Sequence, residues 1–248
     1  MERLAVATAS TVRRRWRTRA IVLVLVAAAI GVAQWPTTTR YGVNFQQFSR
    51  EIPLYEKAVN FVSRDLQTRR LAREVTGGAA TEREILQRIF SWVTVNIRPQ
   101  PEGFPVIDDH IWNIIVRGYG IEDQRTEVFT MLVSYACCPA TAVRLTAEPT
   151  KAIIVAVVLM DDEKPRVFDV ANALVFKNEA GDFATAEDLL HDPELVDKVS
   201  RGMMSQGVPY RRYFSALADL HPIFARMERQ KPWARLKDEL GGLLPGTR

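Results

Sequence analysis

The chain has 248 residues, of which 47% are apolar and 25% are charged, a composition typical of a folded globular protein. Its formal net charge of +4 is concentrated at the N-terminus, because residues 1–41 hold seven arginines against Glu2, a net charge of +6. The rest of the chain therefore carries −2 (+4 less +6), so the basic pI of 9.2 does not indicate a nucleic-acid-binding surface.

An uncharged apolar run, AIVLVLVAAAIGVA at residues 20–33, follows most of these arginines. Extended through Gln34-Trp35-Pro36, it predicts a transmembrane anchor over residues 20–36 behind a basic cytoplasmic segment, residues 1–19. A cleaved signal peptide is the alternative, but its cleavage site, Gly31-Val32-Ala33, is poor. By the positive-inside rule, either reading places residues 42 onward outside the cytoplasm; the anchor predicts a single-pass inner (cytoplasmic) membrane protein. A buried helix is disfavoured because the run has no polar face.

Residues 42–248 show no internal repeat, and we expect one domain over residues 42–200 with a helical C-terminal extension over residues 201–248. Residues 51–75 predict a helix that ends at Gly77-Gly78. Thr81 and Glu84 have the spacing of a capping box and predict the start of a second helix, which ends near Arg98. A proline- and glycine-rich loop then leads to the turn at residues 118–120, which opens a further helix starting near Glu122.

After Pro139 the hydrophobic period changes from helical to alternating. Residues 140–147, 151–160, 166–170 and 173–177 predict strands joined by polar turns, and Thr185 begins another short helix. The tail over residues 210–240 predicts helices broken near Pro222 and Pro232. Helices followed by an antiparallel meander are typical of an α+β fold, with the sheet in the middle of the domain.

This order of elements resembles the transglutaminase-like branch of the papain-type cysteine enzymes. The likeness covers residues 81–190 and is carried by GYGIEDQRTEVFTMLVSYA and KPRVFDVANALVFKNEAGDFATAEDLL. It implies N-terminal helices packed on a central antiparallel sheet. It also implies similarity to exported, membrane-tethered bacterial members associated with polysaccharide and envelope biosynthesis. The resemblance further implies a protein partner and a glycan or peptide ligand, and no cofactor.

In that family a cysteine at the helix N-terminus is activated by a histidine on the facing strand, which an aspartate on the next strand orients. The cysteine position falls here on Glu122. The histidine position falls on Lys151, or on Ile153 or Ile154 in another register. Only Asp169 matches, so the resemblance implies a degenerate site without the thiol nucleophile and its base.

Two interpretations of Glu122 remain open. It could form an ion pair with Lys151 in place of the family's thiolate–imidazolium pair, or it could simply stabilise the positive end of the helix dipole. Other candidate cleft-lining residues are His110, Trp112, Tyr119 and Gln124. A tryptophan within IWNIIV is more often part of a core, and a lone histidine in a loop more often hydrogen-bonds locally.

Cys137 and Cys138 are sequence neighbours, whose Cα atoms lie about 3.8 Å apart, below the ~4.4 Å lower end for ordinary disulfides. We therefore expect buried thiols and no disulfide. A helix C-terminus disfavours a thiolate, which argues against either as a nucleophile. No metal-ligand cluster or nucleotide motif is present in the sequence.

Three functions follow from these observations. The first is a membrane-anchored, non-catalytic binding or scaffold protein, which we favour. The second is an active hydrolase or acyltransferase that uses Cys137 or Cys138. The third is a glycan hydrolase that uses the Glu122 and Asp169 carboxyls. It requires one carboxyl with a raised pKa, although a helix N-terminus or a neighbouring lysine would lower that pKa.

Overall fold

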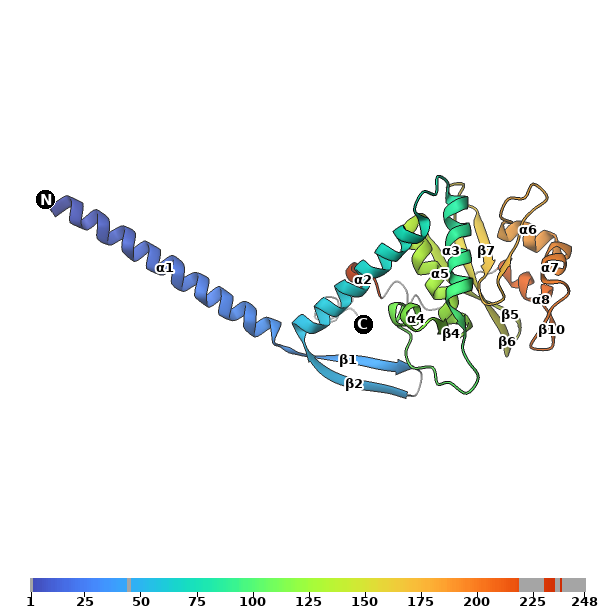
Figure 1. Cartoon of the computed structure of the whole chain (residues 1–248), viewed down its shortest axis with the longest axis horizontal. Coiled ribbons are helices and arrows are strands. Elements are labelled where there is room, and N and C mark those ends of the chain that lie inside the picture. The colour runs from blue at the N-terminus through green and yellow to red at the C-terminus, as the bar shows by residue number, and fades with distance from the viewer. Residues whose placement is uncertain (1, 44–45, 219–229, 235–236, 238–248) are drawn as a thin grey trace. The chain divides into compact units, whose positions relative to one another are not determined.

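The computed structural model of the protein describes residues 2–43, 46–218, 230–234 and 237 (Figure 1). The chain divides into two compact units. Met1–Tyr41 and Gln47–Phe61 form the first, and Gly42–Gln46 and Val62–Arg248 form the second. The predicted boundaries at residues 42 and 201 stay predictions.

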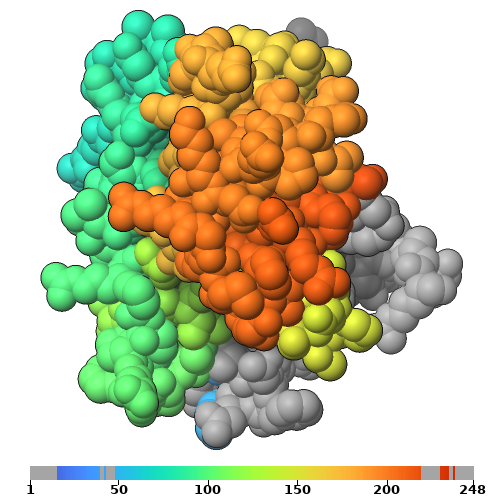
Figure 2. All heavy atoms as spheres, turned by 90° about the vertical axis from the view of Figure 1, so that its right-hand side faces the viewer, coloured from blue at the N-terminus to red at the C-terminus, as the bar shows by residue number. Residues whose placement is uncertain are grey.

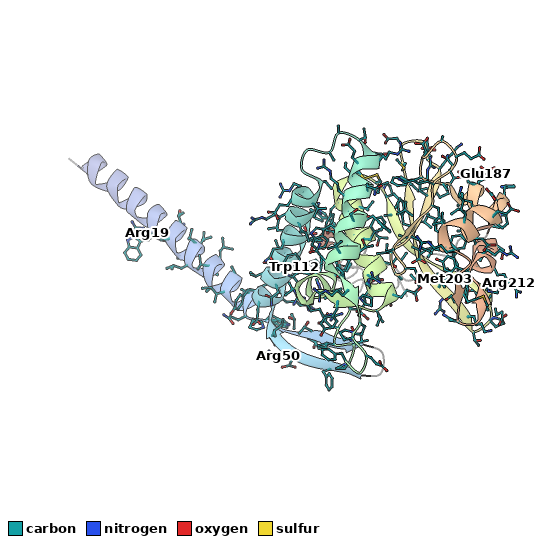
Figure 3. All side chains as sticks on the ribbon, turned by 45° about the vertical axis from the view of Figure 1, so that its right-hand side comes forward. Arg19, Arg50, Trp112, Glu187, Met203 and Arg212 are labelled. Atoms are coloured by element: carbon teal, nitrogen blue, oxygen red, sulfur yellow. A yellow bond between two sulfur atoms is a disulfide. The ribbon has the colours of Figure 1, made fainter. Side chains whose placement is uncertain are left out.

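The first unit contains the predicted membrane segment. Helix α1 (Glu2–Ala33) includes an 18-residue stretch, Trp16–Ala33, with a mean hydropathy of 1.7 and none of its surface buried. At about 1.5 Å per residue this stretch is roughly 27 Å long, close to the thickness of a bilayer core. Arg19 lies on this helix (Figure 3). One N-terminal helix is therefore long and apolar enough to span a membrane.

A two-stranded sheet of β1 (Pro36–Val43) and β2 (Gln46–Pro53) follows α1, and helix α2 (Leu54–Thr76) comes next. The backbone N–H of Leu54 donates to Trp35 O at 2.9 Å, which joins the start of α2 to the end of α1. The strands were not expected from the sequence. Their polar residues show no apolar alternation, which is the pattern by which a strand is recognised.

Three further helices lead to the candidate site: α3 (Glu82–Asn96), α4 (Ile111–Arg117) and α5 (Glu122–Ala136). The predicted start of α3 is confirmed, because Thr81 Oγ1 accepts from Glu84 N at 3.2 Å. Glu84 Oε2 accepts from Ala80 N, one residue before the cap. Helix α4 was missed within the expected loop because its N-cap is His110, which is not a common capping residue.

The main sheet has four antiparallel strands in chain order: β5 (Ala140–Glu148), β6 (Lys151–Leu159), β7 (Pro165–Asp169) and β8 (Leu174–Val175). Side chains alternate between its faces. On β6, Ala156 and Val158 belong to the core shared with α3, α4 and α5. Ile153, Val155 and Val157 belong to a second core on the other face. The α+β prediction is confirmed, with the sheet in the middle of the domain.

The second core is covered by a layer of short elements. These are α6 (Ala186–His191), α7 (Pro193–Ser200), β9 (Met204–Ser205), β10 (Val208–Pro209), α8 (Arg211–Phe214) and η1 (Ser215–Ala218). Figure 2 shows this layer from outside, where the orange and red atoms spread over the face. Figure 3 marks Met203 and Arg212 here, and Trp112 on α4 beyond the sheet. The capping box of Thr185 and Asp188 is present at α6 as predicted. Val208, Tyr210, Tyr213, Phe214 and Leu217 are buried, so the tail as far as Leu217 packs into the domain. The break predicted at Pro222 lies outside the described residues.

Candidate functional site

A short parallel pairing positions the N-terminus of α5. Strand β3 (Arg98–Pro99) pairs with β4 (Tyr119–Gly120), which follows α4 and directly precedes α5. A Cβ atom on Gly120 would lie 3.0 Å from Gln124 Oε1 and 3.3 Å from an Ile114 methyl group. A larger residue at this position would push against Gln124 and Ile114, so glycine suits the close approach of the chain to the first turn of α5.

The side chain of Glu122, the first residue of α5, contacts the backbone of the facing strand β6. Its Oε1 accepts from Ile154 N at 2.8 Å. Burial is the main reason that the pKa of the Glu122 carboxyl lies above its ordinary value; the hydrogen bond from Ile154 lowers this pKa, whereas the Asp169 carboxylate raises it. The expectation that the helix N-terminus and a lysine lower this pKa is wrong, because burial dominates.

The predicted ion pair between Glu122 and Lys151 is also wrong. Lys151 Nζ instead contacts Glu148 Oε2 at 2.9 Å across the β5–β6 turn. Because side chains alternate along β6, Lys151 and Ile153 share the face opposite to α5, whereas Ile154 shares the α5 face with Ala156. Of the three proposed histidine positions, Ile154 is thus the one that faces Glu122.

Asp169, at the end of β7, is almost completely buried, with 1% of its surface exposed. Its Oδ1 accepts from Asn172 N at 2.9 Å and its Oδ2 accepts from Asn172 Nδ2 at 2.7 Å. Oδ2 also accepts from the Tyr210 hydroxyl. Burial raises the pKa of Asp169 in spite of these hydrogen bonds, and burial raises the pKa of Tyr210 as well. Both Asp169 oxygens are thus occupied by residues of the protein itself.

Arg125 was not identified from the sequence, although it lies next to the candidate site. It is 5% exposed, and it donates from Nε to Ile97 O at 2.9 Å and from Nη1 to Ala171 O at 2.6 Å. Burial lowers the pKa of its guanidinium, and the nearby Asp169 carboxylate opposes this effect. Its position in the polar first turns of α5, among Glu122, Asp123 and Glu127, gave no sequence signal of burial. Arg125 joins the end of α3 to the segment after β7.

The prediction that Gln124 lines a cleft is wrong, because its side chain is fully buried. Gln124 Oε1 accepts from Arg117 Nη2 at 2.7 Å, and its Nε2 donates to Asp109 Oδ1 at 2.6 Å and to Asp108 O at 3.1 Å. These contacts use both ends of the amide to hold the preceding loop against α5. Its role in this structure is to position the loop.

His110 is likewise turned inward. Its Nδ1 accepts from Trp112 N at 3.3 Å, and burial, together with the charge of Arg64, lowers its pKa to about 4. It is therefore neutral at physiological pH and serves as a helix cap. Trp112 is half-buried on α4. Tyr119 is half-buried beside the N-terminus of α5, with its ring centroid 6.0 Å from that of Phe104.

The two cysteines lie at the other end of α5, where the expectation of two thiols is wrong. Cys137 and Cys138 are joined by a disulfide, with Cα atoms 3.8 Å apart. Adjacent residues can join here because Cys137, with φ −149° and ψ −53°, has left the helical conformation. A thiolate nucleophile is therefore absent from this oxidised form.

Other chemistry-bearing groups lie apart from this site. His191 Nδ1 contacts Glu187 O on α6, and His221 lies outside the described residues. Within the part of the chain that the structure describes, no group of three His, Cys, Asp or Glu side chains could hold a metal ion. A surface hollow of ≈ 440 Å³ lies between α2 and α3, lined by Val75, Trp92 and Val95 among others, and does not include Glu122.

No protein-family model and no curated protein matches the sequence. The chain is similar to a solved structure from Cytophaga hutchinsonii provisionally described as a cysteine protease, with 10% identity, a TM-score of 0.37 and coverage of 50% of each chain. It is also similar to a provisionally described protease from Parabacteroides distasonis (12%, TM-score 0.33, 55% of this chain and 39% of that chain) and to a TGase (11%, TM-score 0.37, 54% and 43%). The chain spans half or less of the length of each solved chain. These identities and TM-scores show neither a shared family nor a shared activity.

Proposed function

We propose that the protein is a membrane-anchored, non-catalytic transglutaminase-like protein that acts as a binding or scaffold component of an envelope or exopolysaccharide system. The single observation that carries the proposal is the contact between Glu122 and Ile154. At the two positions where the family resemblance requires a cysteine and a histidine, this chain has a carboxylate that accepts from the backbone of an isoleucine. The arrangement has a carboxyl group at the N-terminus of α5 in place of a thiol nucleophile.

Two further observations support a binding role over catalysis. The cysteines are joined to each other at the opposite end of a 15-residue helix, roughly 22 Å from Glu122. Ile121, next to Glu122 in the sequence, is an exposed apolar side chain, and so is Phe104, whose ring contacts that of Tyr119 just before α5. Exposed apolar residues next to a polar centre are suited to contact with a partner protein or a glycan. The basic N-terminal segment and α1 support an inner-membrane location with the main domain outside the cytoplasm.

The test is affinity purification of the detergent-solubilised full-length protein from its native membrane, with bound proteins and glycans identified by mass spectrometry. Ile121→Arg should reduce recovery of a stoichiometric partner at least tenfold, because it places a charge at the contact surface. Met204→Arg, which changes another exposed apolar residue on β9, is the matched control and should not. Equal recovery with both variants would contradict a role for this surface, and turnover of a glycan or peptide lost in Cys137→Ala would contradict the non-catalytic assignment.

A carboxylate-based glycan hydrolase is the second candidate, and the raised pKa of Glu122 favours it. A general acid in glycoside hydrolysis needs a raised pKa of this kind. Asp169 is a poor second carboxylate, because its oxygens are occupied by Asn172 and Tyr210. Hydrolysis of envelope glycans that disappears in Glu122→Gln would support this candidate over the scaffold, and no hydrolysis by the wild type would remove it.

A further inference from the structure

The disulfide between Cys137 and Cys138 lies where three segments meet. The backbone N–H groups of Cys137 and Cys138 both donate to Val133 O, at 2.9 and 3.3 Å, so the pair closes the C-terminus of α5. Cys138 Sγ lies 3.3 Å from Glu82 Oε1 at the first residue of α3. Glu82 Oε2 accepts from Asp161 N, in the turn after β6, at 3.0 Å.

A disulfide between sequence neighbours contributes little to the stability of a fold. A disulfide stabilises a fold mainly by closing a loop in the unfolded chain, and the effect grows with the length of that loop. Here the cysteines are one residue apart, so essentially no loop is closed. The consequence of this bond is therefore chemical: it stores two oxidising equivalents at the end of α5.

The two sulfurs differ in their access to solvent and in their surroundings. Cys137 is half-buried, whereas Cys138 is only 2% exposed. Cys137 is therefore the more accessible of the two to a thiol reagent from solvent. Glu82, held by its contact with Asp161, lies beside the sulfur that would leave.

We propose that the Cys137–Cys138 disulfide is a thiol–disulfide exchange site that is opened by a thiol reductant attacking Cys137. The thiolate of the reductant forms a bond to Cys137 Sγ, the bond between the two protein sulfurs breaks, and Cys138 leaves as a thiolate that takes a proton from solvent. A second thiol displaces the reductant from Cys137. In total, two thiols are oxidised to one disulfide, and the protein disulfide is reduced to two thiols.

Glu82 acts on both forms of this site. Its carboxylate disfavours negative charge on the departing Cys138 sulfur, which slows opening, because like charges repel at this distance. After reduction, the Cys138 thiol can donate its new proton to Glu82 Oε1 at the existing separation of 3.3 Å. The same geometry thus protects the disulfide against slow reductants and accommodates the dithiol form.

The test uses the full-length protein in detergent, treated with glutathione, quenched with iodoacetamide and analysed by peptide mass spectrometry. Without glutathione neither cysteine should be alkylated, and limited reduction should place glutathione on Cys137. In Glu82→Gln, opening should be roughly threefold faster, because the departing Cys138 thiolate no longer lies beside a carboxylate and is the better leaving group. Glu84→Gln, two residues away on the same helix turn, should react at the wild-type rate.

Alkylation of both cysteines before reduction, glutathione on Cys138, or an unchanged rate in Glu82→Gln would each overturn the proposal. A second pair of variants needs no reductant. The free Cys137 thiol in Cys138→Ser should be alkylated at least tenfold faster than the free Cys138 thiol in Cys137→Ser. The opposite order would also overturn the assignment of Cys137 as the sulfur that is attacked.

Discussion

The two ends of α5 differ in the chemistry that each makes available. The N-terminal end, where unpaired N–H groups favour an anion, holds Glu122. The C-terminal end, which disfavours an anion, holds Cys137 and Cys138 in a disulfide. A thiol enzyme needs its sulfur at the first of these ends. The comparison teaches that a helix can carry both an anion-stabilising site and reactive residues without activating them, because the two lie at opposite poles.

The largest effect on stability should come from substituting Arg125, which lies near the N-terminal end of α5. Arg125→Met leaves the carbonyls of Ile97 and Ala171 buried without their donor. We expect a loss of about 3 kcal/mol in the free energy of unfolding, measured by urea denaturation. Arg70→Met on α2 removes an exposed ion pair with Glu74 and should leave the free energy of unfolding nearly unchanged. Equal effects of the two changes would contradict the buried role of Arg125.

A comparable effect should appear on acidification through His110, next to this end of α5. Its folded pKa of about 4 lies below the ordinary 6.5, so the unfolded state binds a proton that the folded state does not. Stability should therefore fall by about 3 kcal/mol between pH 6.5 and pH 4. His110→Asn keeps a capping acceptor and should lose this component. Identical pH profiles of unfolding for the two proteins would show that His110 is not buried in its neutral form.

Glu122→Gln removes the ionisable carboxyl from the N-terminus of α5 but keeps an oxygen acceptor for Ile154 N. It therefore tests whether a charge is favoured at this end of the helix. The folded pKa of Glu122 is raised, so its protonated form is stabilised, and this stability is present at low pH and lost as pH rises through the folded pKa. The variant should therefore gain thermal stability relative to wild type at pH 7 and show no gain below pH 4. A variant that is less stable at pH 7 would instead indicate that the charged carboxylate is favoured by the helix dipole.

The smallest effect should come from Lys151→Glu. Lys151 pairs with Glu148, and both side chains are about one-third exposed. Exposed pairs contribute little, so the change should leave the free energy of unfolding nearly unchanged. Differential scanning fluorimetry of the full-length protein against Glu148→Lys provides the check. A large loss in Lys151→Glu alone would restore an interaction between Lys151 and Glu122.

Local patterns predicted much of the fold. The capping residues Thr81 and Thr185, and the alternation along β6, depend on contacts within a few residues. The sequence also indicated the helix that begins at Glu122. The β1–β2 sheet and α4 were missed because one lacks apolar alternation and the other has an unusual N-cap.

The candidate site was predicted only in part, because its partners are distant in the sequence. Glu122 was singled out, but its contact with Ile154 depends on which face of β6 meets α5. The hydroxyl of Tyr210 reaches Asp169 from a segment 41 residues away, and no local pattern points to it. Features that depend on neighbouring residues were therefore predicted, whereas contacts between residues far apart in the sequence were not.

By itself, the sequence determined the apolar N-terminal helix, the order of α3, α5 and the strands of the main sheet, and a carboxyl side chain at the start of α5. These depend on residue type and short-range periodicity. Only the tertiary structure decided that Lys151 faces away from Glu122, that Asp169 is occupied by Tyr210, and that the two cysteines are joined. The physical reason is that pairing, burial and sheet face depend on how segments far apart in the chain pack together, which residue identity alone does not specify.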